Sequence, residues 1–380
     1  NFTDFDFDGS NFSVLIDTLA YNTYITAFNS NMVVNESFLD SATLRQNVVS
    51  LANNIGYTPR SKTAANAQIS FDVQITNNVS SVTLKEGLVC TGDVNNETYT
   101  FAITEPISTT VVNGKAKFEN VNVYQGIYLE KTFTYDGSLD QRFILDNDSI
   151  DVSKIVVFVR DSGSSGGVEY QVVDNIINVN SESKIYLINE IQDEKYELKF
   201  GDGFFGKKLG SSSGGSGADG DEILVKYITT DGEEGNGAQK FVFSGKIVDS
   251  NNVSVNADNI SVKTVSKSQN GGNIEPIDSV KYFSPITYAA QNRAVTARDY
   301  EAIIKKIYPN TESVSVIGGE ELDPPEFGTV AISIKPQNGD LVSDFTKNQI
   351  LSKLKQYSIS GINQKIIDLK LLYVELDSNV

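Results

Sequence analysis

Apolar residues in the first sixty positions recur at the spacing of amphipathic helices. This pattern predicts one helix from about Phe12 to Phe28 and a second from Ser37 to Ile55, which a following glycine and proline would end. The second helix carries a narrow apolar stripe that consists of Leu44, Val48, Leu51 and Ile55. Arg45 lies beside this stripe, where a charge is costly unless it is paired. We expect Arg45 either to pair with Asp17, in the same chain or a neighbour, or to extend into solvent.

The first predicted helix carries large apolar side chains on two opposite sides. Between Ser10 and Asn35 its only charged residue is Asp17. One side holds Phe12, Leu15, Ile16 and Leu19, and the other holds Val14, Tyr21, Tyr24, Ile25 and Phe28. Burying each large side chain contributes roughly 1.5–3 kcal/mol, so a helix that is apolar on both sides must be covered on both sides. We expect either the chain's own β domains or other subunits to cover the second side.

From about Ala67 to Val265 the period changes to two, with many β-branched and aromatic residues, as in Gln68–Ile75 and Glu222–Tyr227. Short strands separated by Gly, Asn, Asp and Ser turns indicate β-sandwich or barrel-like modules. The Gly/Ser-rich tracts at 161–167 and 210–217 are predicted to be flexible hairpin tips.

After Pro285 the pattern predicts helices over Thr296–Tyr308 and Phe345–Tyr357 and strands at 313–317, 329–335 and 365–375. The order helix, strand, strand, helix, strand is typical of a small two-layer unit. The expected fold class is therefore multi-domain α+β: an N-terminal helical pair that forms a bundle, β-sandwich or barrel-like middle modules, and a small C-terminal α/β two-layer unit. The expected domains are 1–62, 63–150, 151–280 and 281–380.

Composition narrows the possible functions. The 380 residues include no His and a single Cys, Cys90, which excludes His-based catalytic triads and a disulfide framework. The net charge of −18 argues against duplex nucleic acid as a partner. No apolar run approaches the roughly 18 residues of a membrane-spanning helix. These observations favour a protein that is not an enzyme and that binds neither nucleic acid nor a membrane.

Two glycine-containing motifs invite ligand-binding interpretations. Gly201, Gly203 and Gly206 match G-x-G-x-x-G, but a Ser/Gly tract rather than a helix follows, so we expect a tight turn with glycines at positive φ. The run Asp4–Gly9 resembles the start of an EF-hand loop, but its twelfth position is Leu15 instead of an acid. We expect no bound metal and no cofactor.

Several segments together resemble the baseplate wedge protein of contractile-tailed phages, in the baseplate J-like superfamily. The N-terminal segments that carry the resemblance are Leu19–Tyr24, Asn31–Ala42 and Gly56–Ser61. The first group of later motifs contains Lys199, Phe200, Gly201, Asp202, Gly203 and Gly206, followed by Ile223–Tyr227, Asp231, Gly232, Gly235 and Asn236. The second contains Ser284, Pro285, Arg293, Thr296, Asp299, Tyr300, Glu301, Gly318–Glu321 and Gly328–Val330.

This resemblance implies a structural role with no active site. In the family, two copies of the subunit join an elongated second wedge protein through a helical bundle, and six wedges close the inner baseplate ring around the tail hub, near a sheath-initiator protein. The subunit would be assembled in the host cytoplasm and rearrange when the sheath contracts. The residues implied in the bundle are Phe12, Leu15, Leu19, Tyr21, Tyr24, Phe28, Leu44, Arg45, Val48, Leu51 and Ile55. Since the family's members are longer and the first residue is Asn, we expect residues beyond both ends.

Two other functions remain open from the sequence. A β-rich surface adhesin could present glycan-binding loops on its strands. A tail-associated cell-wall hydrolase would need two carboxylates facing one cleft, and the chain has adjacent acids such as Glu233 and Glu234. An adhesin has no need for an N-terminal helix that is apolar on both sides, so that helix distinguishes the adhesin from the baseplate subunit.

Overall fold

The computed structural model describes residues 11–75, 79–138, 140–161, 166–173, 179–210, 220–255, 260–291, 293–308, 311–336, 341–342 and 344–368. The chain divides into two compact units. The first, here called the helical unit, comprises Asn1–Pro59 and Pro276–Tyr288. The second, the main unit, comprises Arg60–Glu275 and Ala289–Val380. The fold class expected from the sequence, multi-domain α+β, is confirmed.

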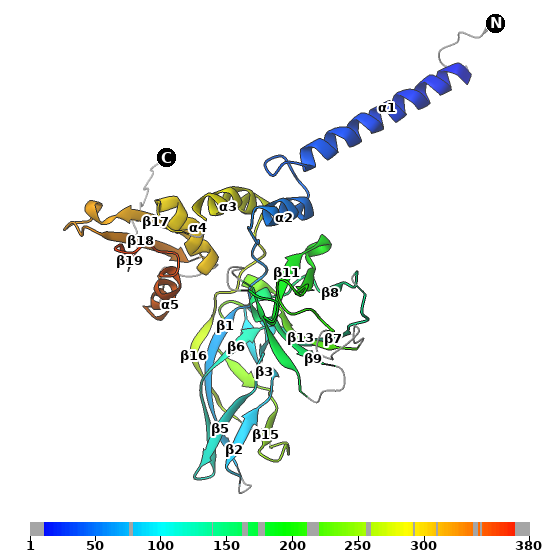
Figure 1. Ribbon diagram of the computed structural model, residues 1–380. Helices are drawn as coiled ribbons and strands as arrows, with labels where there is room; N and C mark the ends of the chain where they lie inside the picture. Colours follow the sequence, from blue (N-terminus) through cyan, green and yellow to red (C-terminus); the bar gives the residue numbers. More distant parts are fainter. Residues whose placement is uncertain are drawn as a thin grey trace, which may run out of the picture. The chain divides into compact units, whose positions relative to one another are not determined.

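The helical unit contains α1 (Asn11–Glu36), α2 (Arg45–Asn54) and most of α3 (Ile277–Ala290) (Figure 1). Its small core joins α2 to α3 and consists of Ala42, Val48, Ala52 and Val280, with Leu39, Leu51, Tyr57 and Ile277 packed against it. The Nζ of Lys281 also donates a hydrogen bond to the Asp40 carbonyl, at 3.0 Å. No residue of α1 belongs to this core, so burial against α2 and α3 does not stabilise α1.

The helix boundaries differ from those that periodicity predicted. α1 continues to Glu36, past the expected end at Phe28, because no glycine or proline interrupts it. α2 begins at Arg45 instead of Ser37, because the Glu36 carboxylate binds the turn before it. That carboxylate accepts hydrogen bonds from Thr43 N (2.8 Å), Thr43 Oγ1 (2.7 Å), Leu44 N (3.2 Å) and Asn47 Nδ2 (2.8 Å). These bonds, above all the one from Asn47, lower the pKa of Glu36 from 4.5 to about 2.

The main unit begins with a nine-stranded, barrel-like sheet, in which β1 pairs with both β6 and β16. Its strands are β1 (Asn66–Gln74), β2 (Ser81–Leu84), β3 (Gly87–Val94), β4 (Glu97–Ile103), β5 (Ile107–Val112), β6 (Lys115–Gln125), β14 (Phe241–Phe243), β15 (Ile247–Asp249) and β16 (Val262–Gln269). Aromatic side chains fill its core, where Phe71 stacks on Phe118 and Phe101 meets the edge of Phe241. Figure 1 shows β16 beside β1, although almost 200 residues separate them in sequence.

A second sheet of seven strands has its own core. Its strands are β7 (Ile127–Thr134), β8 (Phe143–Leu145), β9 (Val156–Arg160), β10 (Val168–Val172), β11 (Ile185–Glu190), β12 (Tyr196–Phe200) and β13 (Glu222–Thr229). All neighbours are antiparallel except β10 and β11. Short 3₁₀ turns in the main unit occupy Val152–Lys154, Gln192–Glu194, Gly232–Gly235 and Gly319–Glu321.

The strands pair in a nested order rather than in the linear order that the expected domains imply. The first sheet takes strands from 66–125 and from 241–269, and the second sheet is built entirely from 127–229. The divisions expected at 150 and 280 therefore do not follow the pairing, because alternation shows where strands are but not which strands pair. Each Gly/Ser tract joins two strands of the second sheet, β9 to β10 and β12 to β13. The interiors of these tracts lie outside the described residues.

Buried polar groups tie the second sheet to the first. The Gln125 side chain donates to Asp231 Oδ2 (2.7 Å) and accepts from Thr230 Oγ1 (2.6 Å). The buried Asp151 carboxylate accepts from Ala64 N at 2.9 Å, and burial raises its pKa. Since such groups are costly when they lose their partners, this junction resists opening.

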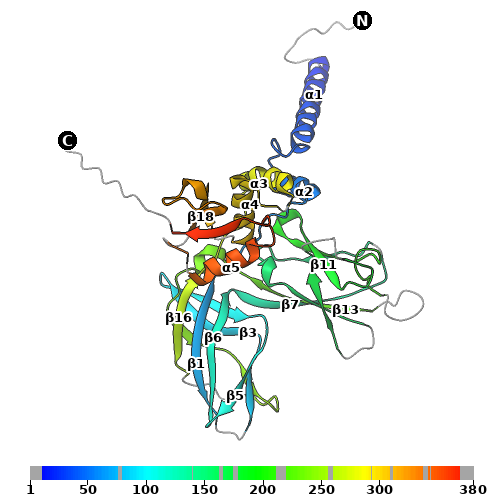
Figure 2. The ribbon, with the colours of Figure 1, turned by 60° about the vertical axis from the view of Figure 1, so that its left-hand side comes forward.

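The C-terminal part has the predicted order of elements. These are α4 (Ala297–Ile307), β17 (Thr311–Gly318), β18 (Thr329–Pro336), α5 (Asp344–Leu354) and β19 (Asn363–Ile367). β18 pairs antiparallel with β17 and parallel with β19. The two helices lie on one face of this sheet, where Ile304 and Leu354 pack with Ile332 (Figure 2).

Candidate interaction surfaces

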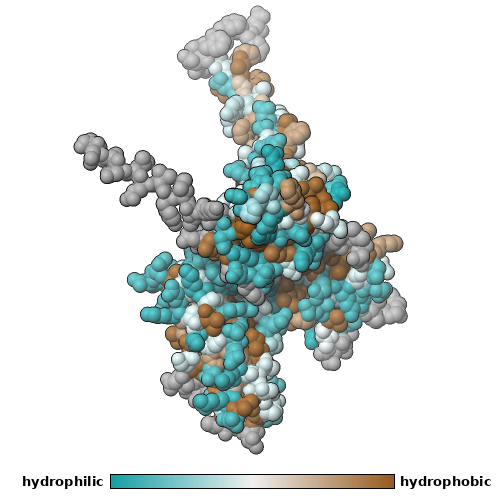
Figure 3. All heavy atoms as spheres, turned by 90° about the vertical axis from the view of Figure 1, so that its left-hand side faces the viewer, coloured by the Kyte–Doolittle hydropathy of each residue, from teal (hydrophilic) through white to brown (hydrophobic). Residues whose placement is uncertain are grey.

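α1 exposes the apolar side chains that the sequence placed in a partner interface. The exposed fractions lie between 51% and 68% for Phe12, Leu15, Leu19, Tyr21, Tyr24 and Phe28. Val14 and Val33 are also exposed. Figure 3 shows apolar residues along the outside of this helix. α1 therefore offers a long apolar surface on more than one side, over 26 residues.

The stripe on α2 is divided between the core and the surface. Val48 is fully buried and Leu51 packs on the same core, so these two residues hold α2 to α3 within the chain. Leu44 is exposed, and Arg45 and Ile55 are half-buried. The exposed surface of α1 is thus the larger part of the expected interface.

The G-x-G-x-x-G segment forms the tight turn that the sequence predicted. Gly203 and Gly206 have positive φ, at 94° and 83°. A Cβ on Gly201 would lie 2.2 Å from the Gly206 carbonyl carbon, so positions 201 and 206 both need glycine. The Asp202 carboxylate accepts hydrogen bonds from the backbone N–H of Phe205 and Phe204, each at 2.8 Å, which lower the pKa of Asp202. No helix starts here, so the turn lacks the helix N-terminus of a phosphate site.

The C-terminal motif residues serve mainly to hold α4. Thr296 and Asp299 form a capping box, in which each side chain accepts a hydrogen bond from the other residue's backbone N–H. Tyr300 is buried at 1% exposure in the C-terminal core. Arg293 donates to the Gln291 side chain at 2.9 Å. The contacts of these residues indicate that the motif stabilises the fold rather than binds a ligand.

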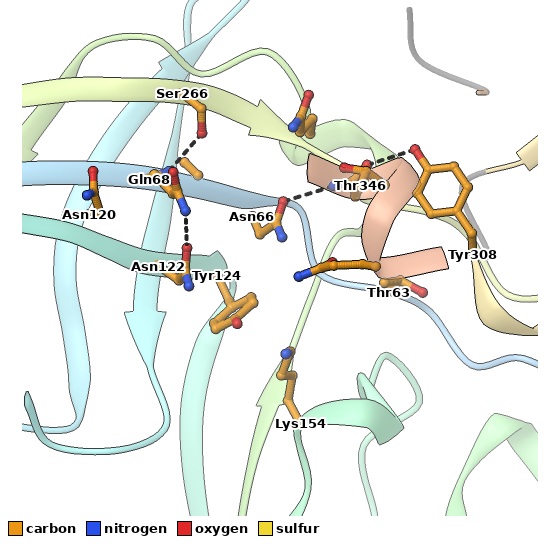
Figure 4. Close-up of a pocket in the computed structure, with 14 residues that line it drawn as sticks. Thr63, Asn66, Gln68, Asn120, Asn122, Tyr124, Lys154, Ser266, Tyr308 and Thr346 are labelled. Carbon is orange, nitrogen blue, oxygen red and sulfur yellow. Dashed lines mark hydrogen bonds between the residues drawn. The ribbon is translucent and has the colours of Figure 1, made fainter. Parts of the chain in front are cut away.

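A cavity of about 720 Å³ opens over β1, β6 and β16 (Figure 4). Its lining is rich in amides and hydroxyls and consists of Thr63, Asn66, Ala67, Gln68, Asn120, Asn122, Tyr124, Lys154, Ser266, Gln269, Asn270, Tyr308, Thr346 and Gln349. Gln68 Nε2 donates to Asn122 Oδ1 at 3.0 Å, and Lys154 Nζ lies 3.9 Å from the centre of the Tyr124 ring. The lining has no carboxylate, so it does not provide the acid pair of a hydrolase. Lys154 also covers a ring face on which a sugar could stack.

Two exposed aromatic sites escaped the sequence reasoning. Phe204 and Phe205 lie in the glycine turn at 83% and 58% exposure, and Phe327 lies between β17 and β18 at 83%. The available signal was the presence of large apolar residues inside segments rich in Gly, Pro and acids, which cannot reach a core.

The described part of the chain offers no other obvious chemistry. It contains no group of three metal-ligating side chains. Its helices include none long and apolar enough to cross a membrane. The loop expected from Asp4 to Gly9 lies outside the described residues.

Comparisons with known proteins find similarity at both ends of the chain and along its whole length. Residues 1–57 match the family described as baseplate wedge protein gp6-like, helical domain, and residues 296–367 match baseplate structural protein gp6, C-terminal domain I. The chain is 27% identical over 394 aligned residues to the baseplate wedge protein gp6 of Enterobacteria phage T4, covering 100% of this chain and 58% of that protein. The chain therefore spans a little more than half the length of this curated relative.

Among solved structures, the anti-feeding prophage baseplate matches with a TM-score of 0.29 and 13% identity, over 96% of this chain and 72% of that one. The sequence matches define the class: a structural protein of the baseplate of a contractile phage tail, and so a component of the virion. Within that class, the chain is similar to the gp6-like baseplate wedge proteins, which confirms the resemblance that its motifs indicated.

Proposed function

We propose that the chain is a wedge subunit whose α1 joins a helical bundle, as two copies together with another wedge protein. In this proposal six wedges form the inner baseplate ring near the tail hub and a sheath-initiator neighbour, after assembly in the host cytoplasm. The exposed apolar surface of α1 is the observation that carries the proposal.

Energetics supports a bundle at α1. Each large apolar side chain that becomes buried contributes roughly 1.5–3 kcal/mol, and α1 exposes such side chains on opposite sides. A helix of 26 residues is about 39 Å long, at 1.5 Å per residue. A single partner helix would cover only one side, so a bundle of several helices accounts for the pattern better than a simple pair.

The proposed rearrangement during sheath contraction needs segments that can move. The Gly/Ser tracts join strands of one sheet, so they are poor hinges between domains. The hydrogen bonds of Gln125 and Asp151 also hold the two large sheets together. We therefore place the motion where the chain passes from one compact unit to the other, at residues 59–60, 275–276 and 288–289.

Charge substitutions on α1 test the proposal. We expect Leu19→Asp combined with Tyr24→Asp to prevent assembly with the wedge proteins encoded by neighbouring genes, because two charges would enter the apolar bundle. The readout is the mass of the co-expressed complex, measured by light scattering after size exclusion. Both positions are exposed and outside the core of the helical unit, so the thermal unfolding of the free chain should not change.

The matched control is Asn29→Asp combined with Asn31→Asp, which adds the same charge to exposed polar positions of the same helix that lie between its two apolar sides. This control should lose much less of the complex. Normal assembly of the Leu19→Asp, Tyr24→Asp variant would show that α1 is not the interface.

A further inference from the structure

The cavity over β1, β6 and β16 is lined by amides at positions where strands seldom carry them. Asn66 on β1 and Asn122 on β6 line it, although asparagine is depleted in strands. Neither has positive φ, so the left-handed backbone that asparagine tolerates does not account for them. Near the start of β6, outside the cavity, exposed positions hold Lys115 and Lys117 instead. Residues that break a local preference are expected at functional sites, so the amides point to binding.

Two of these amides present a hydrogen-bonding pattern that complements a polypeptide backbone. Gln68 Nε2 donates to Asn122 Oδ1 at 3.0 Å, which holds the two side chains side by side on neighbouring strands (Figure 4). Within the described residues, Gln68 Oε1 accepts no hydrogen bond and Asn122 Nδ2 donates none. The pair therefore offers an acceptor beside a donor. One residue of an extended chain offers the complementary N–H and C=O on a single side.

The spacing of the lining residues also suits an extended chain. Asn66 and Gln68 are two residues apart on β1, and Asn122 and Tyr124 are two residues apart on β6. At roughly 3.4 Å per residue, each pair spans about 6.8 Å, the interval at which an extended peptide repeats its groups on one side. In the pairing of the strands, Gln68 stands opposite Asn122 and Asn66 stands opposite Tyr124. A peptide that lies along the two strands therefore meets polar groups at each repeat.

Lys154 carries the only charge among the described residues that line the cavity. Its Nζ lies 3.9 Å from the centre of the Tyr124 ring and forms no salt bridge with a described residue. Asp151 attracts Lys154, but its buried carboxylate already accepts hydrogen bonds from Ser153 N and Ala64 N. A lysine ammonium donates up to three hydrogen bonds, so a carboxylate of a ligand at Lys154 Nζ would form a charge-assisted one.

We infer that this cavity binds an extended peptide segment of another protein, with an Asp or Glu side chain of the peptide at Lys154. Its volume of about 720 Å³ falls within the roughly 300–1,000 Å³ of typical ligand sites. A peptide fits better than a sugar, because Lys154 covers the face of Tyr124 on which a sugar would stack. Binding here does not involve α1, so it goes beyond the bundle proposed above.

A library of random short peptides, panned on the immobilised full chain, tests this binding. The full chain should enrich peptides that contain Asp or Glu. The Lys154→Glu chain should not enrich the same peptides, because like charges would then meet in the cavity. The most enriched peptide is next synthesised with blocked ends, together with a version in which its acid is replaced by the corresponding amide. Calorimetry measures the affinity of both versions for the full chain and its variants.

The two versions of the peptide should respond differently to the variants. Lys154→Gln should weaken the acidic peptide about tenfold or more and leave the amide version almost unchanged, because it removes a charge-assisted hydrogen bond. Asn122→Ala should weaken both versions, because it removes a donor to the peptide backbone. Asn122 is exposed, so this variant tests the site even if the loss of Lys154 disturbs the fold. The matched control, Lys117→Gln, removes an exposed lysine of β6 outside the cavity and should change neither affinity.

Acidic peptides whose affinity depends on both Lys154 and Asn122 would support a peptide site. No enrichment by the full chain, or peptides whose affinity neither variant changes, would overturn it. Sialyllactose and trigalacturonic acid are measured in parallel, and binding of either one that Lys154→Gln abolishes would overturn the peptide in favour of an acidic sugar. The Leu19→Asp, Tyr24→Asp chain separates this site from the bundle, because it should still bind the peptide when wedge assembly fails.

Discussion

Gly126, at the junction of the two large sheets, is the residue that tolerates substitution least. It follows β6, has φ of 134°, and packs so closely on β13 that a Cβ would lie 2.1 Å from the Thr229 carbonyl oxygen. Next to it, the Gln125 side chain binds Thr230 and Asp231. Both the backbone conformation and the space at this position therefore require glycine.

We expect Gly126→Ala to destabilise the chain by at least about 3 kcal/mol, from backbone strain and overlap with β13 together. Gly114→Ala is the control, because Gly114 also has positive φ, 73°, but its nearest neighbour, the Ile75 carbonyl oxygen, would lie 3.5 Å from the new Cβ. The control should cost only about 1–2 kcal/mol. Denaturant unfolding followed by tyrosine fluorescence compares the two variants.

Equal unfolding midpoints for the two variants would contradict a tight junction. Sequence reasoning found the glycines of the 201–206 turn, because they lie close together in a motif. It could not single out Gly126, because its requirement comes from Thr229, which is distant in sequence and becomes a neighbour only when β13 has paired with β7.

Among the elements, α1 is unusual because its large apolar side chains are exposed and none of them belongs to a hydrophobic core of the described residues. Most helical stability in proteins comes from tertiary packing, and isolated helices in water are only marginally stable. The hydroxyls of Thr18, Thr23 and Ser30 also bond to carbonyls four residues earlier, which adds little to helix stability. In the free chain, the backbone hydrogen bonds of α1 should therefore break often.

We expect the amides of α1 to exchange with deuterium far faster than those of α2 in the free chain, because α2 is held by Val48 and Val280. In the assembled wedge, α1 should become protected. Hydrogen exchange read by mass spectrometry compares both states. Strong protection of α1 in the monomeric chain would show that the helix is already covered.

The accuracy of the sequence prediction differed among elements for physical reasons. α4 was placed nearly correctly because its capping box and apolar period are local. The start of α2 was placed too early, because Glu36 reaches forward from α1 to bind Thr43 and Leu44. α3 was missed because Pro285 lies inside it, and proline normally indicates the end of a helix.

For the whole molecule, the most informative feature is that the second sheet is inserted into the first. The buried core of the second sheet uses residues between 129 and 227 only. The core of the first sheet needs residues from both sides of this insertion, including Phe101 and Phe241. The sequence shows the strands of both sheets but carries no local signal for this arrangement.

We expect a fragment of residues 127–229 to unfold cooperatively on its own, and a fragment of residues 63–126 to remain largely unfolded. The second fragment lacks β14, β15 and β16, which pair with β3, β2 and β1. Circular dichroism during thermal denaturation measures both. Cooperative folding of the 63–126 fragment would show that the returning strands are dispensable.

The nested order of the strands also determines when each strand can pair during synthesis on the ribosome. β1 emerges early, but its partner β16 follows about 200 residues later, which at roughly 5–20 residues per second is a delay of about 10–40 s. During this time the inserted sheet can complete its fold, whereas one edge of β1 remains unpaired. Slow codons after residue 229 would prolong that exposure, and a fast run through residues 241–269 would shorten it.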